Sequence, residues 1–248
     1  MFRTPREIYH FHETVENPLH LPARFGVLSW NVNKRRNIRE YQQIFHHLKA
    51  EWNLHLFCLQ EARFRNSHPF LLEGYHYYGS ANLRAQRTHY GVLTASSTRS
   101  IQSTARLSEG RELYLATYKP YLVNLFPLSN GETLLCLNIH AINFRENSRY
   151  TYELLQIMTF LSTHQGPMII SGDFNSWNPA RKRSLNAFCR QLSLKQVPFD
   201  GGKIKSFGGH LLDFIFYRNF SLIRYEVKDL PGYSDHNPLL AEFKIGKQ

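Results

Sequence analysis

The chain contains the stretch Met168-Ile169-Ile170-Ser171-Gly172-Asp173-Phe174-Asn175, in which a short apolar run ends in polar side chains. Apolar runs rich in Val, Ile, Leu and Phe are typical of strands that are buried on both faces. Strands of this kind bring the charged groups at their ends together. The pattern therefore predicts an active site for metal-assisted chemistry at the strand ends. Similar polar endings follow other apolar runs at Asn31, Gln60-Glu61, Asp213 and Ser234-Asp235-His236.

The segments between these runs alternate between strand and helix patterns. A strand is expected over residues 25–30, and Asn37-Ile38-Arg39-Glu40 then begins a helix with a sequence like a capping box. A strand over residues 54–59 follows, and this order predicts an α/β sandwich. Helical stripes also occur over residues 150–161 and after Ser184. Further strands are expected over residues 91–94, 113–118, 134–139, 168–170, 211–217, 222–227 and 239–243, with loops over 96–111 and 201–210.

Length and composition indicate an ordinary globular protein. A chain of 248 residues can bury one large core, and we expect one domain over residues 24–248 after an N-terminal arm over residues 1–23. Three cysteines, an odd number, lie in apolar or helical segments and are interpreted as reduced core residues. The sequence shows no secretory signal and no membrane-spanning stretch, so a cytoplasmic monomer is expected. The cysteines are Cys58, Cys136 and Cys189.

The chain is strongly basic. Its 30 Lys and Arg residues against 19 Asp and Glu residues give a net charge of +11, which attracts nucleic acid, phospholipid or phosphorylated metabolites. A charge that serves only solubility is the alternative. Basic residues follow two of the polar strand ends, at residues 34–39 and 181–183. We expect Lys34, Arg35 and Arg181 to bind substrate phosphates beside the site.

Two carboxylates have candidate roles in this chemistry. Glu61 ends an apolar run, where a divalent cation would offset the cost of burying its charge, although an ion pair with Arg63 is the alternative. Asp173 and Asn175 are two residues apart, which places both on one side of an extended backbone. The carboxylate can orient or deprotonate a water while the amide holds that water or a phosphate oxygen. A simple turn is the alternative for this pair.

Two histidines complete the candidate site. His236 follows Asp235, and Asp213 lies in a separate strand, which permits a carboxylate to fix the imidazole tautomer and stabilise its protonated form. A core histidine with a structural hydrogen bond is the alternative for His236. His140 ends another apolar run and can donate to a phosphoryl oxygen, or else be an ordinary residue of the rim.

In combination and order, these motifs resemble the endonuclease/exonuclease/phosphatase superfamily of metal-dependent phosphoesterases, which includes DNase I. The resemblance covers residues 26–243. The amino-acid sequences of residues 138–144 and 234–240 are similar to those of the small bacterial YafD-like branch. The motifs that carry the resemblance are Trp30-Asn31, Gln60-Glu61, His140, Gly172-Asp173-Phe174-Asn175, Leu212-Asp213-Phe214 and Ser234-Asp235-His236.

The resemblance implies a four-layer α/β sandwich of the DNase I-like type, with two mixed β-sheets face to face and helices outside. It also implies that Glu61 is the principal Mg²⁺ ligand with Asn31 beside it, Asp235 being a further ligand or a supporting group, and that Mn²⁺ is a substitute for Mg²⁺. In the same pattern, Asp173 orients or activates the attacking water and Asn175 holds water or phosphate. His236, paired with Asp213, contacts the scissile phosphate.

The leading hypothesis is a Mg²⁺-dependent hydrolase that cleaves phosphodiester bonds in DNA or RNA, with nucleic acid as its substrate. A phosphatase or phosphodiesterase that acts on a phospholipid or a small phosphorylated metabolite is the alternative enzyme. A basic module that binds nucleic acid without catalysis is the alternative of another class. The aromatic and arginine pattern of the abasic-site enzymes is not found between the third and fourth motifs, nor are the extended signatures of inositol phosphatases, so neither specialised activity is expected.

Overall fold

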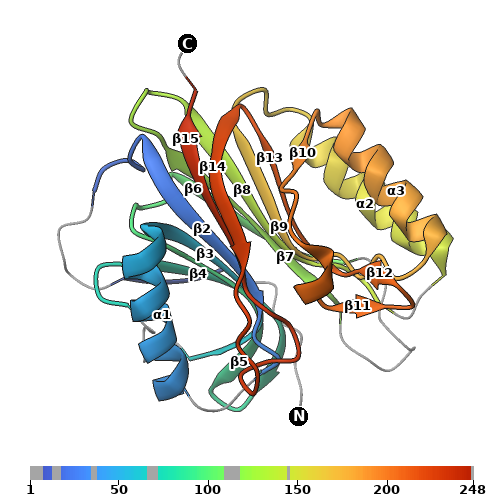
Figure 1. Ribbon diagram of the computed structural model, residues 1–248, viewed down its shortest axis with the longest axis horizontal. Coiled ribbons are helices and arrows are strands. Elements are labelled where there is room, and N and C mark those ends of the chain that lie inside the picture. Colours follow the sequence, from blue (N-terminus) through green and yellow to red (C-terminus); the bar gives the residue numbers. More distant parts are fainter. Residues whose placement is uncertain are drawn as a thin grey trace.

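The computed structural model describes residues 8–12, 18–34, 38–65, 72–108, 118–143 and 146–246, and these contain two large sheets packed face to face (Figure 1). One sheet has the order β1 (Ile8–His12), β4 (His76–Ala85), β5 (Thr88–Ser96), β3 (Leu54–Phe64), β2 (Arg24–Asn31), β15 (Leu239–Ile245) and β14 (Phe220–Val227). The other has the order β10 (Lys195–Gln196), β13 (Asp213–Arg218), β9 (Met168–Asp173), β8 (Thr133–His140), β7 (Pro120–Pro127) and β6 (Gln102–Leu107). Both are mixed, because β2 pairs with β3 and β8 pairs with β9 in parallel.

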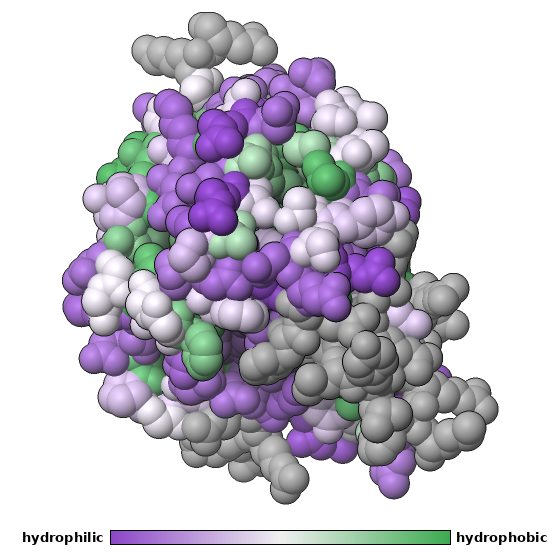
Figure 2. Space-filling model, turned by 90° about the vertical axis from the view of Figure 1, so that its right-hand side faces the viewer, coloured by the Kyte–Doolittle hydropathy of each residue, from purple (hydrophilic) through white to green (hydrophobic). Residues whose placement is uncertain are grey.

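Helices cover the outer face of each sheet. In α1 (Ile38–Trp52), Tyr41, Phe45 and Leu48 are buried against β2 and β3, which makes one outer layer. On the other side, α2 (Asn147–Leu161) and α3 (Pro179–Gln191) bury apolar residues against β8 and β9. The predicted four-layer α/β sandwich is therefore confirmed. Seen from the α2 and α3 side, the surface is mostly hydrophilic, as an outer helix layer requires (Figure 2).

The space between the sheets is filled by apolar residues of both. Polar atoms also meet there. Gln60 Nε2 donates to Asn138 Oδ1 at 2.8 Å, and Asn138 Nδ2 donates to the carbonyl oxygen of Leu93 at 3.0 Å. Beside this pair, the free thiols of Cys58 and Cys136 lie 3.7 Å apart, so these two cysteines are core residues as predicted.

Three sequence-based expectations are wrong, two at the edges of the sheets and one at the start of a helix. The described part of the expected N-terminal arm is integrated in the fold, because Ile8–His12 pairs with β4 and Leu21 is fully buried. The expected loop over residues 96–111 contains β6, an edge strand with one solvated face. The third helix begins at Pro179, well before Ser184, because the Asn178 side chain accepts a hydrogen bond from the Arg181 backbone N–H.

The structure also contains strands in segments for which the sequence predicted a loop or no regular element. Neither β4 nor β7 was predicted, whereas the expected strand over residues 113–118 falls outside the described residues except for Tyr118, which lies outside the strands. The expected loop over 201–210 contains the short helix η1 (Gly201–Lys203) and the hairpin of β11 (Ser206–Phe207) and β12 (His210–Leu211). Among the described helices, none combines the length and apolarity needed to cross a membrane.

Gly172 permits the close approach of β9 to β8. Its φ of 142° is rarely adopted by residues with a side chain, and a Cβ at this position would overlap the carbonyl oxygen of Ile139. We predict that Gly172→Ala lowers the free energy of unfolding by roughly 3 kcal/mol or more, measured by urea denaturation. Gly131→Ala is the matched control, since Gly131 also has a positive φ but open space around it, and it should cost only about 1 kcal/mol. Equal losses in the two variants would show that the close approach is unimportant.

Candidate active site

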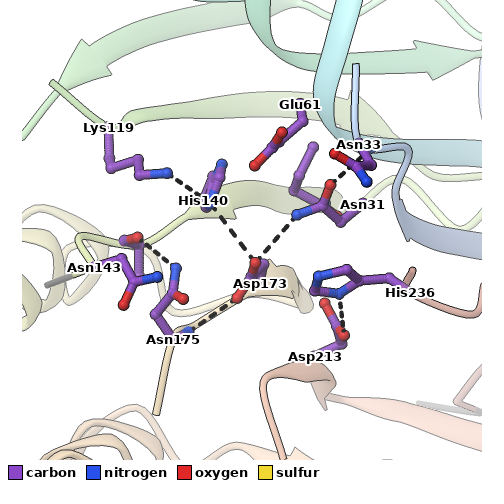
Figure 3. A network of polar contacts seen from close by, with 12 residues as sticks. Asn31, Asn33, Glu61, Lys119, His140, Asn143, Asp173, Asn175, Asp213 and His236 are labelled. Carbon is purple, nitrogen blue, oxygen red and sulfur yellow. Dashed lines mark hydrogen bonds and ion pairs between the residues drawn. The ribbon is translucent and has the colours of Figure 1, made fainter. Parts of the chain in front are cut away.

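Three site residues lie side by side because of strand register. In the parallel pair of β8 and β9, His140 is opposite Asp173, and in the antiparallel pair of β9 and β13, Asp173 is opposite Asp213. All three side chains are buried. The candidate site is therefore a row of imidazole and carboxylate groups across one end of the six-stranded sheet (Figure 3).

His236 reaches this row from the loop before β15. Its Nδ1 lies 2.7 Å from Asp213 Oδ2, and its backbone carbonyl accepts a hydrogen bond from Trp30 Nε1 at 2.8 Å. The same loop is tied to the end of β2, because Ser234 Oγ donates to the Asn31 carbonyl oxygen at 2.7 Å. The position of His236 is thus set by the seven-stranded sheet, while its charge partner comes from the other sheet.

The charge state of His236 follows from its neighbours. Burial by itself lowers the pKa of His236, but the carboxylates of Asp213, Asp173 and Asp235 outweigh it and raise the pKa to about 9. The imidazole is therefore protonated at neutral pH. Its Nδ1–H donates to Asp213, and the Nε2–H is a second donor.

Asp173 occupies the centre of the row. Its Oδ2 accepts a hydrogen bond from Asn31 Nδ2 at 3.1 Å, and its Oδ1 accepts one from the Asn175 backbone N–H at 3.0 Å. Burial raises the pKa of Asp173 to about 7, with a further contribution from the charge of Asp213, while His236 acts in the opposite direction. A carboxylate with such a pKa can accept a proton near neutral pH.

Lys119 is a site residue that the sequence analysis missed. Its Nζ lies 2.9 Å from His140 Nε2, on the side of His140 away from Asn31 (Figure 3). Burial lowers the pKa of His140 well below its usual value, and the charge of Lys119 lowers it further, so the imidazole is neutral and accepts a hydrogen bond from the ammonium group. Lys119 directly follows the strand expected over residues 113–118, but as a lone lysine it gave no signal, and the pairing of β7 with β8 brings it beside His140.

Glu61 lies where β3 is distorted. Its φ is 51°, and the pairing of β3 with β5 shifts register between Leu59 and Ala62. Figure 3 shows its carboxylate directed toward Asn31 and His140. Its ion-pair partner is Lys34, at 3.3 Å, and not Arg63, the partner considered as the alternative from the sequence.

The expected role of Arg181 in phosphate binding is wrong, because this side chain is fully buried. Its guanidinium donates to the carbonyl oxygens of Ile142 at 2.8 Å and Asn175 at 3.0 Å. It also lies 4.5 Å from the ring centre of Tyr150 and 4.7 Å from that of Trp177. Arg181 therefore fixes the backbone at Asn175 and Ile142 from inside the protein.

Of the remaining site residues predicted from the sequence, Asn175 lies beside the buried row and Asp235 does not. Asn175 is buried, and its Nδ2 donates to the Ala141 carbonyl oxygen at 2.9 Å, which places its amide beside Asp173. Asp235 is half exposed, and its carboxylate binds Lys205 at 3.1 Å instead of joining the buried row. Arg35 lies outside the described residues.

The donor set fits a divalent cation with oxygen ligands. Asp173, Asp213 and His236 have ligand atoms within 4.8 Å of one another. A protonated His236 cannot be a ligand, however, since both of its nitrogens carry hydrogen. Carboxylate and amide oxygens remain at Glu61, Asn31 and Asp173, and these are donors that Mg²⁺ and Mn²⁺ prefer.

The pKa of His236 can be tested by substitution. In Asp213→Asn the main cause of the raised pKa is removed while burial remains, so we predict that the pKa of His236 falls from about 9 to its usual value or lower. Imidazole chemical shifts followed by NMR against pH give this value. Asp235→Asn is the control and should lower the pKa less, because Asp235 contributes least among the three carboxylates. A pKa that stays near 9 in Asp213→Asn would contradict the assignment.

Comparison with known proteins identifies the family. The model of the Endonuclease/Exonuclease/phosphatase family matches residues 28–236, so the chain belongs to this family and is by family a phosphoester hydrolase. Within the family, membership of the YafD-like branch stays a prediction.

Solved structures share the fold at low sequence identity. A family member from Bacteroides thetaiotaomicron has a TM-score of 0.68 at 16% identity, over 90% of this chain and 98% of that one. The human Nocturnin catalytic domain with a bound sulfate anion has a TM-score of 0.63 at 16% identity, over 98% and 100%. A mannosyl-6-phosphatase from Bacteroides thetaiotaomicron VPI-5482 has a TM-score of 0.64 at 18% identity, over 88% and 99%.

Proposed function

We propose that the protein is a Mg²⁺-dependent phosphodiesterase that hydrolyses DNA or RNA. The observation that carries the proposal is the row of His140, Asp173 and Asp213 with the imidazolium of His236 held against it. A buried carboxylate that can take a proton thus lies beside donors that can stabilise negative charge. Attack of water on phosphorus needs both functions.

In this proposal Asp173 orients the attacking water and accepts its proton. Its raised pKa suits that exchange, and its hydrogen bonds from Asn31 and Asn175 fix the direction of the carboxylate. The Asn175 amide carries a second N–H besides the one bound to Ala141, and this N–H holds the water or a phosphate oxygen.

The positive groups stabilise the charge that develops on the phosphoryl oxygens. The Nε2–H of His236 donates to one of them, while Asp213 keeps the imidazole protonated and oriented. Lys119 supplies a second positive charge, and it adds to the effect of burial in lowering the pKa of His140, which keeps that imidazole neutral. Positive groups placed in advance in a buried site are more effective than the same groups in water.

Glu61 and Asn31 would hold the cation. Asp235, which pairs with Lys205 outside the buried row, would support the site only through its charge, which helps to raise the pKa of His236. A bound Mg²⁺ supplies Lewis-acid neutralisation of the phosphate charge. Lys34 now occupies the position beside the Glu61 carboxylate, and its exposed side chain is free to turn toward a substrate phosphate instead.

Charge supports nucleic acid as the substrate. The net charge of +11 favours a polyanion, and Lys34 and Lys119 lie at the site itself. Arg35, the residue after Lys34, remains a proposed phosphate contact. Contacts of this kind bind the backbone without reading the bases.

Cleavage of oligonucleotides in Mg²⁺ tests the proposal. We predict that Glu61→Gln and His236→Ala each lower the rate by roughly 10²- to 10⁴-fold, because each removes a group that acts on the reacting phosphate. The rate is measured from gel-resolved products of labelled DNA and RNA, and EDTA should abolish it in the wild type.

The matched control is Glu51→Gln with His47→Ala, a carboxylate and an imidazole whose side chains lie 3.6 Å apart at the surface of α1. This variant should keep the wild-type rate. Site variants that cut as fast as the wild type would refute the proposal. Salt-sensitive DNA binding without any hydrolysis would indicate the non-catalytic module instead.

Metal binding has a test that needs no turnover. We predict that Mg²⁺ or Mn²⁺ raises the thermal midpoint of the wild type by a few degrees at saturating concentration, since a ligand at 100 times its Kd stabilises the folded state by about 2.7 kcal/mol. Differential scanning calorimetry without substrate measures the shift. It should be much smaller in Glu61→Gln and unchanged in Glu51→Gln. The same shift in all three proteins would exclude Glu61 as a ligand.

A small phosphate ester is the second candidate substrate. A cavity of about 650 Å³ lies between β6 and α2, and a smaller cavity that includes Lys119 and His140 shares Ser108, Tyr121 and Glu153 with it. A cavity of this volume can hold a small molecule. The mannosyl-6-phosphatase shows that the fold accommodates such a substrate in another protein. Faster hydrolysis of sugar or lipid phosphates than of oligonucleotides would favour this candidate.

A further inference from the structure

The hairpin of β11 and β12 presents a large aromatic side chain to solvent. Phe207 is 61% exposed, and it precedes the turn Gly208-Gly209, whose φ angles of 57° and 78° are positive at both residues. Turns of this kind form tight two-residue hairpins. The ring is thus held on a short rigid element instead of a long loop.

This hairpin leads directly into the active site. Phe207 pairs with His210, and the chain continues through Leu211 and Leu212 to Asp213. Three residues of extended chain span at most roughly 10 Å, so His210, the hairpin partner of Phe207, lies within about that range of Asp213. Leu212 is fixed on both sides, because its N–H donates to Lys205 and its carbonyl oxygen accepts from Phe174.

Trp177 supports the exposed ring from the side of the Asn175 segment. The ring centres of Trp177 and Phe207 are 6.2 Å apart at 78°, an edge-to-face contact. Trp177 is itself held, since its Nε1 donates to Asn143 Oδ1 at 2.9 Å and the Arg181 guanidinium covers its ring. Phe207 therefore keeps a defined orientation while most of its surface remains in contact with solvent.

We infer that Phe207 and Trp177 form a stacking subsite for an unpaired nucleobase next to the scissile phosphate, and hence that the substrate is single-stranded nucleic acid. This inference rests on the proposed function. Every base has a π-face that can stack on an aromatic side chain, but in a duplex that face is covered by the neighbouring pairs. Lys203, just before the hairpin, provides positive charge for the adjoining backbone, whereas Lys205 is paired with Asp235.

Binding without metal separates the inference from catalysis. Fluorescence anisotropy in EDTA compares a short oligothymidylate with the same backbone made of abasic tetrahydrofuran residues. Phe207→Ala should weaken binding of the oligothymidylate by about 5- to 50-fold, because stacking on an aromatic side chain contributes that much. Its binding of the abasic oligomer should not change. Phe207→Trp should keep wild-type binding, and Phe207→Leu should resemble Phe207→Ala.

The control variant is Tyr152→Ala, which removes an aromatic residue that is 40% exposed and belongs to α2 instead of the hairpin. It should bind both oligomers as the wild type does. In Mg²⁺ the wild type should cleave a single strand faster than the matching duplex, and Phe207→Ala should lose most of this preference.

Two results would overturn the stacking subsite: equal binding by the wild type and Phe207→Ala, or equal weakening for both oligomers. If the enzyme cleaves oligonucleotides but Phe207→Ala is unchanged, the subsite is wrong and the proposed nuclease stands. If binding depends on the bases and on Phe207 but no oligonucleotide is cleaved, the subsite stands and the proposed reaction is wrong.

Discussion

Strand register across β8, β9 and β13 is the constraint on which the site depends. It places His140, Asp173 and Asp213 in one row at the ends of three adjacent strands. A shift of one residue in either pairing would move a site side chain to the opposite face of the sheet. Gly172 keeps β9 close enough to β8 for this row to form, so the backbone of one glycine affects the positions of the groups on both sides.

The sequence predicted most of the strands that reach the site, but it missed the interior strands β4 and β7 as well as the edge strands β1 and β6. The strands β2, β3, β8, β9 and β15 are buried on both faces, so each reads as a continuous apolar run. An edge strand such as β1, with two histidines in five residues, or β6, with one solvated face, has no such run. Its place in the sheet is fixed by pairing with a neighbour that is distant in sequence, which periodicity does not reveal.

For the site, the sequence identified acidic, amide and imidazole groups better than it identified cations. The positions of Asn31, Asp173 and Asp213 at strand ends predicted that these side chains lie close together, and the structure brings them together. Basic residues next to a motif were assumed to face the substrate. Arg181 is instead buried, since backbone carbonyl oxygens and two aromatic rings replace its contacts with water, while Lys119 lies at the site without any local motif.

The amide pair of Gln60 and Asn138 has a consequence for how the two halves of the site stay aligned. Asn31 and Glu61 belong to one sheet, whereas Asp173 and Asp213 belong to the other. Apolar contacts between sheets are nondirectional and tolerate lateral sliding. A hydrogen bond between buried amides is satisfied in only one alignment, and any slip would leave polar atoms without partners. The hydrogen-bonded pair thus fixes the position of one sheet relative to the other, and with it the distances between the site residues that the two sheets contribute.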